Sequence, residues 1–204
     1  MAGQHDGHLG AVYAARDTDQ VAAAYDAWAE TYEAEMRAAG YRHPSVGLAL
    51  LARHLPRGAG PILDAGAGTG LIGEWLAILG YPQVEALDLS AGMLAVAARK
   101  RVYSRLTQAA MGGPLPYADA SFAAIVSTGV FTTGHVGAEA LPELFRICRP
   151  GGVIVLTCKL TVWQGGIDGW LATHAIERIE TTAPYVSMPG EAATTPSLAV
   201  VLRV

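Results

Sequence analysis

A glycine-rich turn constrains the fold of this chain of 204 residues more than any other feature. In "ILDAGAGTG", residues 62–70, every second position from Gly66 to Gly70 is glycine, directly after a short apolar run that ends in an acid. Each ordered glycine costs roughly 0.5–1 kcal/mol relative to alanine, so three so close together indicate a special demand on the backbone. We predict that a buried strand ends and a helix begins here, with main-chain N–H groups open to a ligand.

Strand-like and helix-like segments alternate from this turn to the end of the chain. The predicted strands are 61–68, 84–89, 106–110, 121–130, 151–160, 176–183 and 197–204, and the predicted helices are 71–80, 91–104, 137–149 and 167–175. This alternation predicts an α/β domain with a mainly parallel sheet. Such sheets bind ligands beyond the carboxyl ends of their strands, where the strand order reverses.

The segment before the turn is predicted to be helical. Large residues at spacings of four, three, four and four form one stripe along a helix from about 18 to 39: Val21, Tyr25, Trp28, Tyr32 and Met36. A second helix is expected over 45–55, ending at Pro56. We therefore predict a mobile tail over 1–17 and a single domain over 18–204, in which a helical lid, 18–56, covers a core, 60–204.

Composition excludes several classes of partner. The net charge is −4 and no block of basic residues is present, which argues against nucleic acid. No stretch approaches the ~18 apolar residues of a membrane span. Cys148 and Cys158 lie in apolar runs and are expected to be buried, reduced thiols of a cytoplasmic protein. The histidines are scattered, so no metal site is expected.

Three kinds of site compete for the glycine turn. A dinucleotide site needs a third glycine where Leu71 stands, and a P-loop needs a lysine that is absent. The third kind has an acid before the turn, Asp64, and a second acid, Asp88, at the end of the next strand, where a carboxylate takes ribose hydroxyls. A ligand with a ribose, a positively charged tail and no phosphate suits both acids. S-adenosylmethionine is such a ligand, although a turn without a ligand remains the alternative.

Four segments in order resemble the class I S-adenosylmethionine-dependent methyltransferases: "LDAGAGTG", "ALDLSAGML", "PLPYADASFAAIVSTGVF" and "ELFRICRPGGVIVLT". More narrowly, "YDAWAETYE" and "GHVGAEALPEL" are similar to the Williams–Beuren-region methyltransferase-like subgroup. The resemblance implies a Rossmann-like, doubly wound sheet of seven strands, the last of them antiparallel.

The resemblance also implies a cofactor site. Its expected members are Asp64, Gly66, Ala67, Gly68 and Gly70 for the methionine moiety, Asp88 for the ribose, Leu89, Met93, Ala110 and Met111 around the adenine, and Ser127, Tyr25 and Tyr32. The rings of Tyr25 and Tyr32 could hold the sulfonium by cation–π contact, whereas Trp28 is expected in the core. Two features depart from the family: Glu33 replaces an Asp, and no Asp precedes the pair Leu115–Pro116 to bind the adenine amino group.

The methyl acceptor is expected beside the loop that follows the fourth strand. That loop offers Phe131, Thr132 and Thr133 as substrate contacts and His135 as a general base, because an unperturbed histidine titrates near neutral pH.

The predicted function is transfer of a methyl group from S-adenosylmethionine to a small-molecule acceptor, with S-adenosylhomocysteine as product, by a monomer or homodimer. The alternative is the same cofactor site without methyl transfer, in a regulatory protein or in a cyclase or decarboxylase. A nicotinamide oxidoreductase is disfavoured by Leu71 and by the lack of a Tyr-x-x-x-Lys motif.

Overall fold

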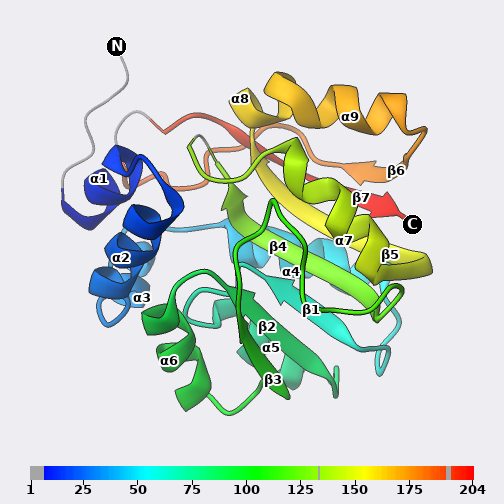
Figure 1. The fold of residues 1–204 in the computed structure, drawn as a ribbon, viewed down its shortest axis with the longest axis horizontal. Helices are drawn as coiled ribbons and strands as arrows, with labels where there is room; N and C mark the ends of the chain where they lie inside the picture. Colours follow the sequence, from blue (N-terminus) through cyan, green and yellow to red (C-terminus); the bar gives the residue numbers. More distant parts are fainter. Residues whose placement is uncertain (1–6, 133, 192–193) are drawn as a thin grey trace.

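The computed structural model describes residues 7–132, 134–191 and 194–204, and its centre is one mixed sheet (Figure 1). The strands are β1 (Ile62–Ala65), β2 (Val84–Asp88), β3 (Arg105–Gln108), β4 (Phe122–Phe131), β5 (Cys148–Lys159), β6 (Glu177–Thr181) and β7 (Ser197–Arg203). Their order is β3-β2-β1-β4-β5-β7-β6, and β7 runs antiparallel to both of its neighbours. The predicted seven-stranded, doubly wound fold with an antiparallel last strand is confirmed.

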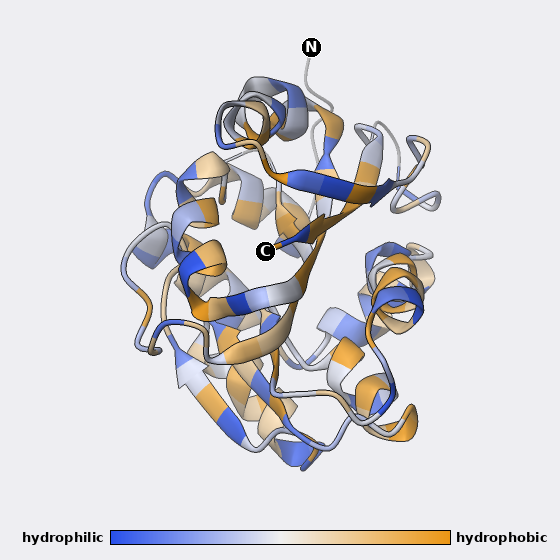
Figure 2. Cartoon of the chain, turned by 90° about the vertical axis from the view of Figure 1, so that its right-hand side faces the viewer, coloured by the Kyte–Doolittle hydropathy of each residue, from blue (hydrophilic) through white to orange (hydrophobic). Residues whose placement is uncertain are grey.

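The inner strands are apolar on both faces because helices cover both sides of the sheet. Along β5, Val153 and Val155 face one layer while Ile154 and Leu156 face the other, as the two-residue period of a strand requires. Hydrophobic colour therefore follows the inner strands in Figure 2, whereas the helices alternate hydrophobic and hydrophilic residues along their length.

Two layers of helices enclose the sheet. The helices α4 (His43–His54), α5 (Leu71–Ile78) and α6 (Ala91–Arg99) pack on one face. The other face carries α7 (Leu141–Ile147), preceded by the turn η1 (Ala138–Ala140), and α9 (Asp168–Thr173), preceded by α8 (Leu160–Val162) and the turn η2 (Trp163–Ile167). Reversal of strand order between β1 and β4 opens the crevice in which this fold binds ligands.

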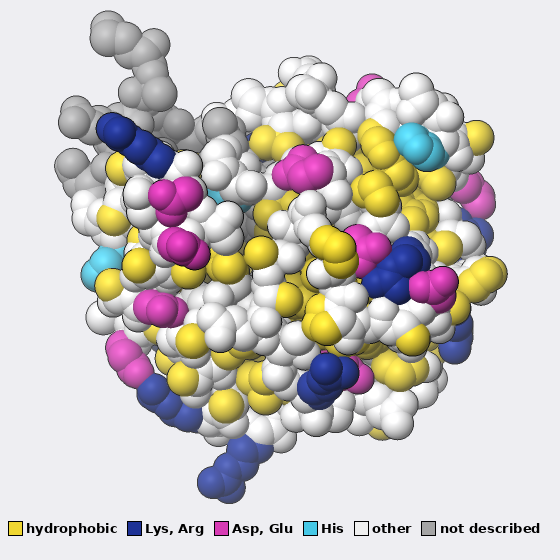
Figure 3. All heavy atoms as spheres, in the orientation of Figure 1, with side chains coloured by type: hydrophobic (Ala, Val, Ile, Leu, Met, Phe, Trp, Pro, Cys, Tyr) yellow, Lys and Arg dark blue, Asp and Glu magenta, His cyan; other side chains and the backbone are white. Residues whose placement is uncertain are grey.

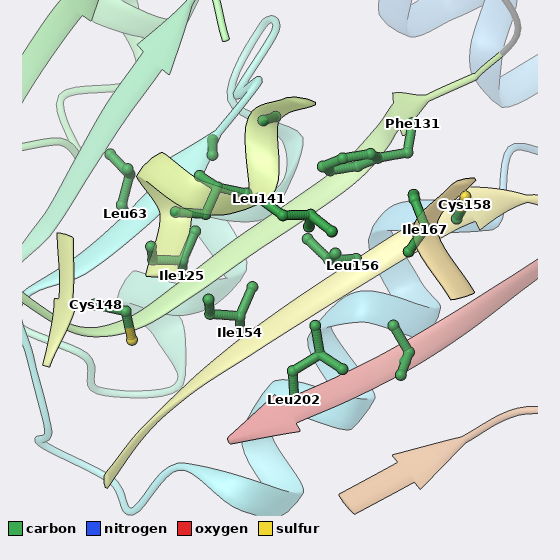
Figure 4. Close-up of a cluster of buried hydrophobic side chains, with 14 of the residues drawn as sticks. Leu63, Ile125, Phe131, Leu141, Cys148, Ile154, Leu156, Cys158, Ile167 and Leu202 are labelled. Carbon is green, nitrogen blue, oxygen red and sulfur yellow. The ribbon is translucent and has the colours of Figure 1, made fainter. Parts of the chain in front are cut away.

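Both cysteines lie in the larger core cluster, at opposite ends of β5 (Figure 4). Cys148 and Cys158 are buried free thiols, and burial raises the pKa of each to about 12. Their expected burial is confirmed.

The N-terminal region differs from the expected tail and single helix. It forms α1 (Gly7–Ala14), α2 (Thr18–Trp28) and α3 (Tyr32–Ala38), and Val12 of α1 is buried beside Trp28. Residues 7–14 are thus a packed helix rather than a loose tail, and residues 1–6 lie outside the described residues. The chain bends between α2 and α3, where the Glu35 carboxylate accepts hydrogen bonds from Trp28 Nε1 at 2.9 Å and Thr31 Oγ1 at 2.5 Å. These contacts span seven and four residues, spacings that an unbroken helix also has, so the stripe predicted one helix.

Acidic side chains of the N-terminal helical region attach α2 and α3 to α6. Asp26 Oδ1 accepts hydrogen bonds from the Gly92 amide at 2.8 Å and the Ser90 hydroxyl at 2.5 Å. Glu33 pairs with Lys100 at 2.7 Å, and Glu30 pairs with Arg99. Acidic side chains gather over α2 and α3 on the face drawn in Figure 3, where Lys and Arg side chains stand apart from one another. None of the helices in the described ranges is both long and apolar enough to cross a bilayer.

Candidate cofactor-binding and active site

A cavity of about 310 Å³ lies at the carboxyl ends of β1, β2 and β4, below the N-terminal helices. Its lining includes Arg16, Asp17, Thr18, Val21, Tyr25, Tyr32, Tyr41, Gly66, Gly68, Leu87, Asp88, Leu89, Met93, Ala109, Ala110, Met111, Thr128, Gly129, Val130, Gly134, His135 and Val136. The structure thus brings ten of the predicted site residues to one hollow: Tyr25, Tyr32, Gly66, Gly68, Asp88, Leu89, Met93, Ala110, Met111 and His135.

The three glycines of the turn have different roles. All three have positive φ, of 79°, 55° and 84° at Gly66, Gly68 and Gly70. A Cβ on Gly66 would overlap Val130 Cγ2, and one on Gly70 would lie 2.9 Å from the Tyr103 ring, so close packing requires both glycines. A Cβ on Gly68 would meet nothing within 4 Å. Gly68 is therefore the glycine that leaves open space for a ligand.

The Asp88 carboxylate forms one polar side of the cavity. Its Oδ2 accepts a hydrogen bond from the Gly68 amide at 2.7 Å, and its Oδ1 accepts one from the Ser90 amide at 2.9 Å. Burial raises the pKa of Asp88, while these backbone hydrogen bonds oppose that rise. Each carboxylate oxygen keeps a lone pair that can accept from a ligand hydroxyl.

Asp64 lies behind the cavity wall, which corrects the expectation that it faces the ligand. Its side chain is 1% exposed, and Asp64 Oδ2 accepts a hydrogen bond from the Tyr103 hydroxyl at 2.6 Å. Burial raises the pKa of Asp64 to about 7. The same Tyr103 ring would overlap a Cβ on Gly73, so α5, the turn and Asp64 pack around one tyrosine.

Five more predicted residues do not line the cavity, and one of them, Thr132, lies beside His135 instead. Ala67 and Gly70 point into the layer between the turn and α6. Ser127 is buried and donates a hydrogen bond to the Ala65 carbonyl at 2.7 Å. Phe131 is fully buried in the core cluster, which corrects its assignment as a substrate contact (Figure 4).

Aromatic rings from the N-terminal helices form the opposite side of the cavity. Tyr25 stacks on Trp28 with ring centroids 6.1 Å apart, and the Tyr32 ring meets Trp28 edge-on at 4.9 Å. Trp28 is 1% exposed, as expected of a core residue, and fixes both tyrosines. Burial raises the pKa of Tyr25 and Tyr32 well above the ordinary value, so both hydroxyls are uncharged at neutral pH.

The loop after β4 brings a histidine to the same hollow. His135 Nδ1 lies 2.8 Å from Thr132 Oγ1, which orients the ring, and the Tyr25 ring centroid lies 6.0 Å from that of His135. Gly129, with φ of 77°, gives room to Tyr41, whose hydroxyl would overlap a Cβ there. Thr133, a predicted substrate contact, lies outside the described residues.

Sequence reasoning missed several residues of the cavity. Arg16 and Asp17 contribute from the connection between α1 and α2, and Thr18 contributes as the first residue of α2. Asp17 accepts a hydrogen bond from the Gln20 amide as the N-cap of α2, and this capping signal was readable in "DTDQ". Tyr41 carried no such signal, because only the tertiary fold brings it over β4.

The residues of this cavity fit S-adenosylmethionine. Gly68 leaves space at the turn, the Asp88 carboxylate can accept from ribose hydroxyls, and Leu89, Met93, Ala110 and Met111 offer an apolar surface for adenine. The glycine turn lacks the lysine of a P-loop, and Arg16 is the cation among the described residues that line the hollow.

Comparison with known proteins identifies the family. Residues 63–156 match the description of a methyltransferase domain. The chain is 36% identical over 141 residues to Methyltransferase-like protein 27 of Homo sapiens, covering 66% of this chain and 56% of that protein. It is 31% identical over 175 residues to a malonyl-[acyl-carrier protein] O-methyltransferase of Pseudescherichia vulneris, covering 82% of this chain and 67% of that protein. The crystal structure of the [4+2]-cyclase SpnF has the same fold, with a TM-score of 0.69 at 18% identity, and the match covers 93% of this chain and 96% of that one.

The chain belongs to the class I S-adenosylmethionine-dependent methyltransferases, the family that the sequence motifs predicted. Its match to human Methyltransferase-like protein 27 agrees with the narrower resemblance to a methyltransferase-like subgroup. S-adenosylmethionine is the cofactor that this family and fold imply. The chain spans about half the length of most of the curated relatives it matches.

Proposed function

We propose that this protein transfers the methyl group of S-adenosylmethionine to a small-molecule acceptor. One observation carries the proposal: the open space at Gly68 and the carboxylate of Asp88 lie in the same cavity as the aromatic rings of Tyr25 and Tyr32. The first two suit the methionine and ribose portions of the cofactor, and the rings suit a sulfonium.

When bound, S-adenosylmethionine supplies a methyl group activated by the sulfonium, and its loss leaves S-adenosylhomocysteine. The contribution of the protein is then mainly to position the acceptor and to exclude water. Tyr25, Tyr32 and Tyr41 cover the cavity from the side of α2 and α3, and we assign these helices the role of a lid over the sheet edge. His135 accepts a proton where the acceptor must lose one, held in orientation by Thr132.

A small acceptor agrees with the enclosure of the site. The cavity of about 310 Å³ lies at the lower end of the range for small-ligand sites, and α2 and α3 border it on one side. Relatives named malonyl-[acyl-carrier protein] O-methyltransferase provide a chemical precedent for a carboxylate among the candidate acceptors.

Calorimetry with S-adenosylmethionine and with NAD tests the cofactor, and a screen of small acids, phenols and amines for methylated product tests the reaction. We expect saturable binding of S-adenosylmethionine, no binding of NAD, and product from at least one class of acceptor. Tight binding of NAD, or no binding of S-adenosylmethionine by the folded chain, would refute the proposal.

A further inference from the structure

A second, smaller chamber adjoins the cofactor cavity on the side of the N-terminal helices. Its volume is about 40 Å³, and it lies between α1, α2, α3 and the carboxyl end of β5. Five residues line both hollows: Tyr25, Tyr32, Tyr41, Gly129 and His135. The two hollows are therefore adjacent, and these shared residues stand between them.

The small chamber contains a buried cation. Lys159, near the end of β5, is only 5% exposed and lines the chamber. Its Nζ donates hydrogen bonds to the Thr195 carbonyl at 2.9 Å and the Ser187 hydroxyl at 3.3 Å. An ammonium group has three donors, and no ion pair joins Lys159 to a carboxylate among the residues that the structure describes. Burial lowers the pKa of Lys159, because removal from water disfavours the charged form.

His43 lines the same chamber but is uncharged near neutral pH, so the positive charge in the chamber comes from Lys159. His43 is 2% exposed, and its Nδ1 lies 2.7 Å from the Tyr185 hydroxyl. Burial, together with the charge of Lys159, lowers the pKa of His43 to about 3, so this imidazole is neutral near pH 7. The polar end of the chamber thus offers one ammonium group and uncharged hydrogen-bonding groups.

The size of the chamber selects among anions. A volume of about 40 Å³ holds about three groups the size of water. A carboxylate has three heavy atoms, whereas a phosphate or sulfate has five. Apolar side chains of Trp28, Met36 and Met188 form the rest of the chamber wall.

We propose that this chamber anchors a carboxylate group of the methyl acceptor at Lys159 Nζ, an inference that rests on the function proposed above. The anchored group extends past Tyr25 and His135, so the atom that receives the methyl group lies on the cofactor side. The substrate class is accordingly a small carboxylic acid whose accepting atom is separate from its anchoring carboxylate.

Benzoate and its neutral counterpart benzamide are the probes for this site. Each is titrated calorimetrically into the full chain saturated with S-adenosylhomocysteine. We expect benzoate to bind at least ten-fold more tightly than benzamide. The substitution Lys159→Met should weaken the binding of benzoate by about 10–100-fold and leave the affinity for benzamide unchanged. The matched control is Arg53→Met, which removes an exposed cation of α4 that lines neither hollow and should leave both affinities unchanged.

Equal affinity for benzoate and benzamide in the unaltered chain would overturn the anchor, and this comparison does not depend on a variant that folds. Unchanged benzoate binding by a folded Lys159→Met chain would also overturn it. Binding of S-adenosylhomocysteine is measured in the same experiment. If it binds and benzoate does not, the carboxylate anchor alone is wrong; if it fails to bind, the proposed function fails first.

Discussion

Replacing Asp64 with asparagine should make the protein more stable at neutral and alkaline pH. Asp64 is buried behind the glycine turn and accepts its hydrogen bond from Tyr103. The amide oxygen of the introduced asparagine can accept the same hydrogen bond, so Asp64→Asn removes the ionisation and little else.

The magnitude follows from the pKa of Asp64, which burial raises from 3.8 to about 7. At about 1.4 kcal/mol for each pH unit, this difference corresponds to roughly 4 kcal/mol. Between pH 4 and 7 the folded protein keeps a proton that the unfolded chain has lost. The contribution of Asp64 to the free energy of unfolding is therefore fully present below pH 4 and is lost as the pH rises through 7.

Urea denaturation of the two proteins at several pH values from 4.5 to 8 measures this difference. The variant should gain little at pH 4.5 and roughly 4 kcal/mol over the parent at pH 8. Asp119→Asn, which changes an exposed carboxylate paired with Arg146, should show no comparable gain with pH. A stability difference between Asp64→Asn and the parent that stays constant over the whole pH range would refute a raised pKa at Asp64.

Three further substitutions test the site and the packing beneath it. Asp88→Ala should weaken S-adenosylmethionine binding by roughly 1.5–3 kcal/mol, because it removes charge-assisted hydrogen bonds to the ribose; calorimetry showing full affinity in a folded variant would contradict this role. Gly68→Val should abolish that binding, whereas Gly58→Val, at another glycine of positive φ with open space around it, should cost similar backbone strain and leave calorimetric affinity intact. Trp28→Ala should lower the free energy of unfolding by about 3–5 kcal/mol in urea, since this ring is fully buried between α1, α2 and α3; a loss under about 1 kcal/mol would show that the N-terminal helices do not pack as described.

The fold was predictable because its signals are local or strictly periodic. The apolar runs that became β1, β4 and β5 are buried on both faces, so nearly every residue in them had to be apolar. Ser90 caps α6 through its hydroxyl, which accepts a hydrogen bond from the Met93 amide at 3.0 Å, and such caps depend on residues adjacent in the chain.

The bend at residues 29–31 was not predictable in the same way. Helical spacing continued through it, and the contacts that fix it join side chains from both sides of the bend. The packing of α1 likewise depends on the burial of Val12 against Trp28, which periodicity within α1 does not encode.

The sequence by itself determined the alternation of strands and helices, the position of the glycine turn and the placement of Asp88 at the edge where a ligand binds. These depend on which residues follow one another along the chain. Only the tertiary structure decided which of these groups face the ligand. Asp64 faces Tyr103 instead of the cavity, Phe131 enters the core, and Lys159 meets residues from α1, α3 and the segment before β7 around a second chamber. Side-chain direction and burial depend on neighbours distant in the chain, and only packing brings those neighbours together.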